Sequence, residues 1–302
     1  MLSEELMRSA RLLEIRTRRR VDNLFAGEYH AAFRGQGLEF AEVREYEPGD
    51  DVRSIDWNVT ARTGRPFVKR FVEERQQTVV LAVDATGSQA SGTRGKVKSA
   101  LASECAAVLA VAAARNGDRV ALLLFGGDFE HSGEHFVPPG RGRRHTQRVI
   151  RDILAHEPRG DGPTIDEVAA SLVRTLHRRS IVFLISDFLD LAGEPAGENH
   201  DDRGLMRLAR DHELVAIRTS DPAERRLPPS GLIRLIDPET RVARHALLSG
   251  KRTRRYRAHA SARRNAAARR LARAGVDLVE LSTDRPLIDD LARYFHRREG
   301  RR

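Results

Sequence analysis

The sequence predicts an α/β protein with a doubly wound, mostly parallel sheet, preceded by an N-terminal helix and a region rich in loops and strands. Three observations predict this class. Short, continuous apolar runs recur after residue 77, as expected for strands buried on both faces of a sheet. Segments with the apolar spacing of helices separate these runs. Alternating strands and helices form right-handed crossovers, which produce a parallel sheet covered on both sides.

The first 76 residues differ from the rest of the chain. A partial apolar stripe that includes Leu12 and Ile15, with Ser3 as a possible cap, predicts a helix over 4–20. Residues 27–75 contain short alternating segments and a Pro-Gly turn, which predict strands and loops with little helix. The predicted organisation is therefore a helix and signature region over 1–76, followed by one α/β domain over 77–302.

Within the α/β domain the predicted elements alternate. The strands are expected at 78–84, 119–125, 135–137, 180–187, 213–218 and 276–281, with a hairpin that joins 232–237 to 241–247. The helices are expected at 95–116, 143–155, 164–178, 203–212, 251–274 and 285–297. The apolar stripe of the first of these helices is Val97, Leu101, Cys105, Val108 and Ala112. The single cysteine is therefore expected in the core, and a disulfide within the chain is excluded.

The basic residues that exceed the acidic ones lie in one segment. The formal net charge is +10, and the stretch 241–276 contains Lys and Arg residues but no Asp or Glu. A helix over 251–273 could bind nucleic acid through phosphate contacts, and this is the alternative function. Its only aromatic residue is Tyr256, so base stacking would be poor. An exposed basic face or a contact for an acidic partner is the favoured interpretation.

The composition also suggests where the protein works. No apolar run is long enough for a transmembrane helix, and the charged N-terminal segment lacks the apolar core of a signal peptide. A single cysteine is typical of a reducing compartment. We therefore expect a cytoplasmic protein that does not insert into membranes.

Oxygen-bearing side chains gather where predicted strands end. Asp84, Thr86 and Ser88 follow the first strand of the domain, Thr164 precedes a helix, and Asp187 ends the strand at 180–187. In an open parallel sheet, ligands bind outside the carboxyl ends of the strands. Carboxylates and hydroxyls without nitrogen or sulfur ligands suit a hard cation, so we expect Mg²⁺, with Mn²⁺ or Ca²⁺ as substitutes.

The order of these groups resembles the metal-ion-dependent adhesion site of von Willebrand factor type A domains. The resemblance implies that Asp84, Thr86 and Ser88 hold the metal directly, and that Thr164 and Asp187 do so directly or through water. Two positions depart from the usual pattern. Thr86 replaces a serine, and its β-branch restricts χ1. Gln89 follows Ser88 where an apolar residue is usual.

A longer resemblance covers residues 27–90. The segments that carry it are Arg34-Gly35-Gln36-Gly37, Arg44-Glu45-Tyr46-Glu47-Pro48-Gly49-Asp50-Asp51 and Arg53-Ser54-Ile55-Asp56-Trp57. Together they resemble the signature of the bacterial family called domain of unknown function 58, short soluble type, which directly precedes a von Willebrand type A domain. The resemblance implies a non-enzymatic adaptor or co-chaperone that binds protein clients and works with a MoxR-type AAA+ ATPase.

The signature itself has two interpretations. It could form a partner-binding surface, whose candidates are Arg44, Tyr46, Asp50, Asp51, Arg53, Asp56 and Trp57. Alternatively, its charges form a structural ion-pair network, which we favour for most of these residues. Trp57 is expected to anchor the core or a loop, because tryptophan is mostly buried.

Enzymatic signatures are missing from the sequence. Gly35-Gln36-Gly37 lacks the third glycine and the following helix of a phosphate-binding loop. The histidines show no zinc-ligand spacing, and Thr86 stands where a phosphatase-like Asp-x-Asp motif needs its second acid. We therefore expect a protein that is not an enzyme, with a metal-dependent hydrolase as the remote option.

Overall fold

The computed structural model describes Leu13, Tyr29, Phe33 and residues 38–73, 77–93, 96–127, 129, 133–192, 202–236 and 242–300. The chain divides into two compact units, Phe33–Gln77 and a larger unit of Met1–Ala32 with Thr78–Arg302. The helix predicted over 4–20 lies outside the described residues, except for Leu13.

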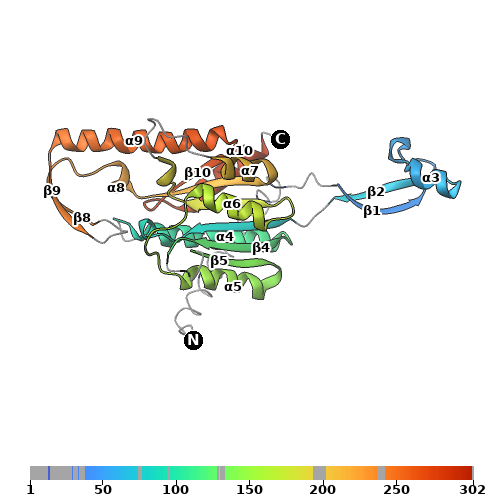
Figure 1. Cartoon of the computed structure of the whole chain (residues 1–302), viewed down its shortest axis with the longest axis horizontal. Helices are drawn as coiled ribbons and strands as arrows, with labels where there is room; N and C mark the ends of the chain where they lie inside the picture. The colour runs from blue at the N-terminus through green and yellow to red at the C-terminus, as the bar shows by residue number, and fades with distance from the viewer. Residues whose placement is uncertain are drawn as a thin grey trace. The chain divides into compact units, whose positions relative to one another are not determined.

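A six-stranded sheet forms the centre of the larger unit, in the order β10-β7-β6-β3-β4-β5 (Figure 1). Its strands are β3 (Thr78–Asp84), β4 (Arg119–Phe125), β5 (Glu134–Gly140), β6 (Ile181–Ser186), β7 (Glu213–Ser220) and β10 (Asp277–Ser282). All neighbouring strands are parallel except β5, which pairs antiparallel with β4 at one edge. The doubly wound, mostly parallel sheet predicted from the sequence is therefore confirmed.

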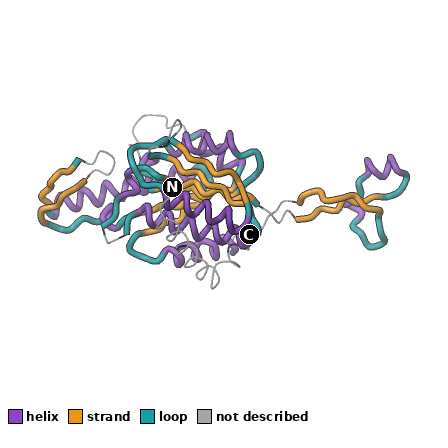
Figure 2. The backbone as a smooth tube through the Cα atoms, turned by 90° about the horizontal axis from the view of Figure 1, so that it is seen from below, coloured by secondary structure: helices purple, strands orange, loops and turns teal. Residues whose placement is uncertain are grey.

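Helices cover both faces of this sheet (Figure 2). They are α4 (Lys98–Arg115), α5 (Gly142–Ala155), α6 (Ile165–Thr175), α7 (Arg203–Asp211), α8 (Pro222–Arg225), α9 (Gly250–Arg273) and α10 (Leu287–Glu299). Alternate residues of each strand point to opposite faces. Val80 and Ala82 pack with α6, α7 and α9, whereas α4 contacts β3, β4, β6, β7 and β10 on the other side. Burial on both faces explains why β3 and β6 are apolar without interruption.

The stripe predicted for α4 is confirmed from Leu101 to Ala112, and Cys105 is fully buried in the core. Val97 is the exception, because it precedes the helix as its N-cap and its side chain is 37% exposed. Lys98 occupies the buried position one residue later. The helix therefore begins its buried face with a lysine, three residues before Leu101.

The smaller unit contains an antiparallel pair, β1 (Leu38–Glu45) and β2 (Phe67–Glu73), with a register shift between Phe40 and Glu42. A 3-10 helix, η1 (Val52–Ser54), and the short helix α3 (Trp57–Thr63) lie between the two strands in the chain. This agrees with the predicted strands and loops with little helix.

The predicted hairpin also forms, as β8 (Gly231–Ile236) paired with β9 (Ala243–Leu248) in a separate antiparallel sheet. It leads into α9, which carries the basic segment. Among the described residues, no helix combines the length and apolar character that crossing a bilayer requires.

Candidate functional site

The candidate site lies at the carboxyl ends of β3 and β6, which are parallel neighbours in the middle of the sheet. Asp84 is the last residue of β3, and Asp187 directly follows β6. Between β3 and α4 the chain makes the short 3-10 helix η2 (Gly87–Ala90), which buries Ser88. The fold thus brings two segments that are about one hundred residues apart in the chain to one edge of the sheet.

Hydrogen bonds join four of the five predicted metal residues. The hydroxyl groups of Thr86 and Ser88 lie 3.0 Å apart, and Ser88 Oγ donates to Asp187 Oδ2 over 2.7 Å. The backbone N–H of Thr86 donates to Asp84 Oδ1 over 2.9 Å. Asp84, Ser88 and Asp187 are all buried. We call Asp84, Thr86, Ser88 and Asp187 the strand-end cluster.

Thr164 is placed differently. It is the exposed N-cap of α6, and its hydroxyl takes part in a capping box with Glu167. The described hydrogen bonds of the strand-end cluster do not include this hydroxyl. The preceding loop still adjoins the cluster, because the N–H of Gly87 donates to the carbonyl of Gly160 over 2.8 Å.

Two glycines make room for the β-branched residue at position 86. A Cβ atom at Gly126 would lie 2.4 Å from Cγ2 of Thr86, and one at Gly162 would lie 2.8 Å from it. Real Cβ atoms do not approach this closely. The methyl group of Thr86 therefore fills space that side chains at these positions would otherwise take, which fixes its hydroxyl beside Ser88.

Asp84 has further partners that the sequence-based prediction did not assign. Its Oδ2 accepts hydrogen bonds from Ser186 Oγ over 2.6 Å and from Gln89 Nε2 over 3.2 Å. Gln89 is fully buried, and its Oε1 accepts a bond from Thr219 Oγ1 on β7. Gln89 therefore links Asp84 to the neighbouring strand, a role that an apolar residue could not fill.

The carboxyl group of Asp84 lies in surroundings that disfavour its charged form. Burial, followed by the nearby charge of Asp187, raises the pKa of Asp84 to about 6. The hydrogen bonds from Ser186 and Thr86 oppose this shift but do not cancel it. A buried carboxylate in this state is stabilised by any additional positive charge placed beside it.

Lys98 places a positive charge beside Asp187, the other acid of the strand-end cluster. Its side chain is 1% exposed, and Nζ lies 2.7 Å from Asp187 Oδ2 and 2.6 Å from Glu224 Oε1. Burial lowers the pKa of Lys98, but the two carboxylates outweigh it, so the pKa is raised and the ammonium form is kept. The prediction from sequence missed this residue, because it began the buried stripe of this helix at Val97 and not at Lys98.

The turn after Asp187 is strained. Phe188 is buried and has a φ of 56°, a left-handed conformation that bulky side chains rarely adopt. The N–H of Phe188 donates to Ser186 Oγ, and the N–H of Leu189 donates to Asp187 Oδ1. Such outliers persist where the surroundings hold them, and they concentrate at functional sites.

The donor set of the strand-end cluster fits a hard divalent cation only in part. No group of three or more His, Cys, Asp or Glu side chains within the described ranges could hold a metal ion. A cation here would depend on Asp84, Thr86, Ser88 and water. Asp187 Oδ2 already receives bonds from Ser88 and Lys98, so this oxygen is suited to contact through water.

The predicted partner-binding residues of the signature lie in the smaller unit and are mostly occupied with local structure. Arg44 pairs with Asp50 over 2.6 Å, as the network interpretation expects. Asp51 caps η1 by accepting a bond from the N–H of Arg53, and Asp56 caps α3. The N–H of Tyr46 donates to the carbonyl of Pro66.

The expectation that Trp57 anchors the core or a loop is wrong. Trp57 is the first residue of α3, directly after the cap at Asp56, and its side chain is 67% exposed. None of the residues of this helix is buried, so Trp57 is not part of a core. An exposed tryptophan is instead available to a partner.

Two arginines of the basic helix form ion pairs with other elements of the fold. Arg264 binds Glu280 through short hydrogen bonds to both carboxylate oxygens, and Arg270 pairs with Asp202. The other bases of the N-terminal half are exposed: Lys251, Arg252, Arg254, Arg255 and Arg257. Exposed positive charge is therefore densest in the first part of α9, while Arg263, Arg269 and Arg273 are exposed further along the helix.

The doubly wound, mostly parallel sheet with helices on both faces places the chain in the α/β class. The chain belongs to the family described as "Protein of unknown function DUF58", whose model matches residues 42–268. The predicted family membership is thereby confirmed.

The chain is similar to several known proteins and solved structures. "Uncharacterized protein Rv1480" of Mycobacterium tuberculosis and "Uncharacterized protein Mb1516" of Mycobacterium bovis are each 32% identical over 299 residues, covering 98% of this chain and 91% of theirs. A structure titled conserved hypothetical protein BatB from Bacteroides thetaiotaomicron matches 74% of this chain and 99% of its own, with 10% identity and a TM-score of 0.44. The VWA domain of SpRpn10 matches 72% of this chain and 94% of its own, with 12% identity and a TM-score of 0.35.

Proposed function

We propose that this protein binds a partner protein at the strand-end cluster, and that Mg²⁺ takes part in the contact. The observation that supports the proposal is the chain of hydrogen bonds that joins Asp84, Thr86, Ser88 and Asp187 at the edge of the sheet. Family membership supports a more general form of this proposal, in which the protein interacts with other proteins.

The local charges favour a divalent cation. The ammonium group of Lys98 pairs with Asp187 and Glu224, whereas the described hydrogen-bond partners of Asp84 are a hydroxyl, an amide and a backbone N–H, all of them neutral. Asp84, Thr86 and Ser88 would hold the ion, which supplies an open coordination position for a carboxylate of the partner. The raised pKa of Asp84 has the direction expected for a carboxylate that lacks a cation.

More specifically, we propose that the protein is an adaptor without enzymatic activity that works with a MoxR-type AAA+ ATPase. It is supported by the resemblance of the signature around Arg44–Trp57 and by the exposed indole of Trp57. In this proposal the strand-end cluster binds the client, and the signature is a candidate contact for the ATPase.

Calorimetry with Mg²⁺ and Mn²⁺ on the full chain tests the metal part. We expect saturable binding by the wild type and at least a tenfold loss in Thr86→Val, which keeps the shape of the side chain but removes its hydroxyl. Asp289→Ala, which removes an exposed acid of α10, is the matched control and should bind as the wild type does. Equal binding by Thr86→Val and the wild type would refute the assignment.

A pull-down with the tagged chain tests whether a MoxR-type ATPase is the partner. A purified MoxR-type ATPase should be retained by the tagged chain, and Trp57→Ala should weaken retention while Asp289→Ala should not. Retention that is the same for all three proteins would exclude this surface.

Nucleic-acid binding is the second candidate, supported by the exposed bases of α9. Lys251, Arg254, Arg255 and Arg257 have no acidic partner among the described residues. Phosphate-driven binding weakens steeply as salt rises, so a salt titration with a fluorescent DNA duplex tests it. Absence of binding at low salt would remove this candidate.

A further inference from the structure

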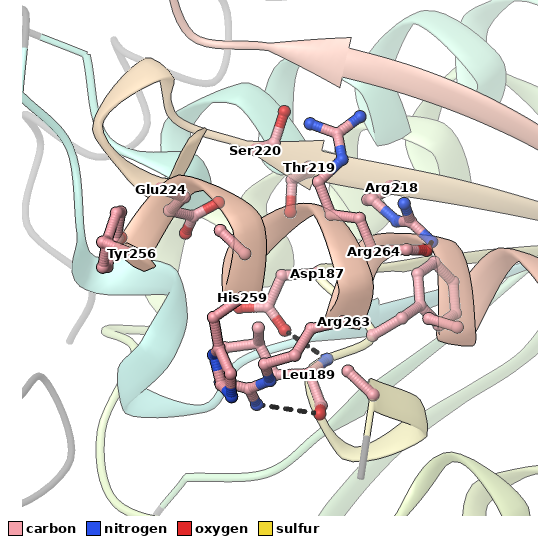
Figure 3. Close-up of a pocket in the computed structure, with 14 residues that line it drawn as sticks. Asp187, Leu189, Arg218, Thr219, Ser220, Glu224, Tyr256, His259, Arg263 and Arg264 are labelled. Atoms are coloured by element: carbon pink, nitrogen blue, oxygen red, sulfur yellow. Dashed lines mark hydrogen bonds between the residues drawn. The ribbon is translucent and has the colours of Figure 1, made fainter. Parts of the chain in front are cut away.

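A cavity of about 240 Å³ lies beside the strand-end cluster, between the ends of β6 and β7 and helix α9 (Figure 3). Asp187 belongs to both, because it lines the cavity and binds Ser88 and Lys98 of the cluster and α4. None of the site residues predicted from the sequence other than Asp187 lines this cavity. It therefore adds a distinct binding surface to the same edge of the sheet.

Part of the lining is apolar. Phe188 and Leu189 come from the strained turn after β6, and Ala260 and Ala267 come from α9. Small side chains on the helix leave the space open, and the apolar atoms favour a ligand with a carbon chain over a bare inorganic ion.

Arg218, at the carboxyl-terminal half of β7, gives the cavity a positive wall. Its side chain is 3% exposed, and its terminal nitrogens donate to Glu280 Oε1 over 3.1 Å and to the carbonyl of Arg264 over 3.3 Å. Its Nε–H is buried and has no hydrogen-bond partner. A buried donor without an acceptor is unfavourable, so an acceptor supplied by a ligand would be stabilised there.

Positive charge exceeds negative charge around this wall. Glu280 receives both Arg218 and Arg264, while Arg225 lies close enough to affect both arginines. Burial lowers the pKa of Arg218, Glu280 and Asp187 oppose the shift, and Arg264 and Arg225 add to it. An anion near these guanidinium groups would relieve their mutual repulsion.

Arg263 extends the positive wall to the surface. It is exposed, it lines the cavity, and its acceptor among the described residues is the carbonyl of Leu189 at 3.4 Å (Figure 3). Its other donors are available to a ligand. The two acids of the lining, Asp187 and Glu224, both bind Lys98, so they oppose an anion less than free carboxylates would.

We propose that this cavity receives the side chain of a glutamate presented by a protein partner, with the carboxylate at Arg218 and Arg263 and the methylene groups against Phe188 and Ala260. The choice of a protein as the source rests on the proposed function. Because no metal enters this contact, the cavity and the strand-end cluster can be tested separately.

NMR of the arginine Nε–H groups of the full ¹⁵N-labelled chain, in EDTA, tests the proposal. The probe is glutamate capped by an N-acetyl group and a C-terminal amide, and capped glutamine is its neutral control. We expect a saturable shift of the Arg218 Nε–H signal with capped glutamate and none with capped glutamine. Inorganic phosphate forms a third titration.

Variants locate the contact. Arg263→Ala should weaken the apparent affinity roughly tenfold, because a charged hydrogen bond is lost. Ala260→Phe, which fills the cavity without changing charge, should abolish the shift. Arg269→Ala, which removes an exposed arginine of α9 outside the cavity, should have no effect.

Three outcomes would overturn the proposal. The absence of a saturable shift would show that the cavity binds no carboxylate, and an equal response to phosphate would show a general anion site without a role for the methylene groups. An effect of Arg269→Ala equal to that of Arg263→Ala would place binding on the helix surface. Binding of the probe in EDTA together with failure of Mg²⁺ calorimetry would refute the metal part of the proposed function alone.

Discussion

The ammonium group of Lys98 lies 2.7 Å from the Asp187 carboxylate, and both side chains are buried beneath the strand ends. The same nitrogen binds Glu224 at the start of α8 and so connects three elements of the larger unit. The interaction holds an ammonium group beside Asp187, on the side of the strand-end cluster that faces α4.

Replacing Lys98 by methionine should lower the free energy of unfolding by roughly 3 kcal/mol, because it leaves the buried carboxylate of Asp187 without its cation. Urea denaturation measures the change. Lys96→Met is the matched control, since Lys96 pairs with Glu104 at a partly exposed position and should cost about 1 kcal/mol or less. Similar losses in the two variants would contradict the structural role of Lys98.

Gln89→Met should cost roughly 2 kcal/mol of stability, although methionine suits the position in shape. The variant removes a donor from the buried Asp84 and an acceptor from Thr219, and unpaired buried groups are costly. The double variant Gln89→Met with Thr219→Val should lose less stability than the two single variants lose together. In the double variant the Thr219 hydroxyl, which would lack a partner, is absent. Strict additivity in urea denaturation would argue against the bridge.

His212 should make the protein less stable as the medium becomes acidic. Burial lowers the pKa of His212 below its ordinary value of 6.5, and Nδ1 accepts a bond from the N–H of Ser180. The unfolded chain therefore takes up the proton first, and the stability contributed by neutral His212 is lost as pH falls below about 6.5.

His212→Asn keeps an acceptor for Ser180 but does not titrate. Between pH 7.5 and pH 5 the difference in unfolding free energy should change in favour of the variant. A difference that stays constant across this range would show that His212 does not contribute to the pH dependence.

Trp57→Ala should leave the free energy of unfolding within about 0.5 kcal/mol of the wild type, because the indole is exposed and α3 buries no residue. Thermal denaturation checks this directly. A loss of several kcal/mol would restore the anchor role that the sequence suggested.

The order of strands and helices could be predicted because burial on both faces makes β3 and β6 apolar throughout. The same periodicity placed Cys105 in the core. The proximity of Asp84 and Asp187 could also be predicted, because neighbouring parallel strands end at the same edge of the sheet.

Other features depend on long-range contacts that periodicity does not record. Lys98 is buried because Asp187 and Glu224, both distant in the chain, surround its ammonium group. Thr164 caps its helix instead of joining the strand-end cluster. A threonine directly before a helix suits a cap as well as a metal ligand, so the sequence alone does not separate the two roles. Trp57 is exposed because its short helix has no apolar face to bury.

Mg²⁺ binding at the strand-end cluster is the central claim, and Ser88→Ala gives its most direct test. Ser88 Oγ links Thr86 to Asp187, and its loss removes one proposed ligand without adding charge. Calorimetry at pH 7.5 should show saturable Mg²⁺ binding by the wild type and at least tenfold weaker binding by Ser88→Ala, with Asp289→Ala unchanged. Equal Mg²⁺ affinity in the wild type and Ser88→Ala, or no binding by either, would contradict the account.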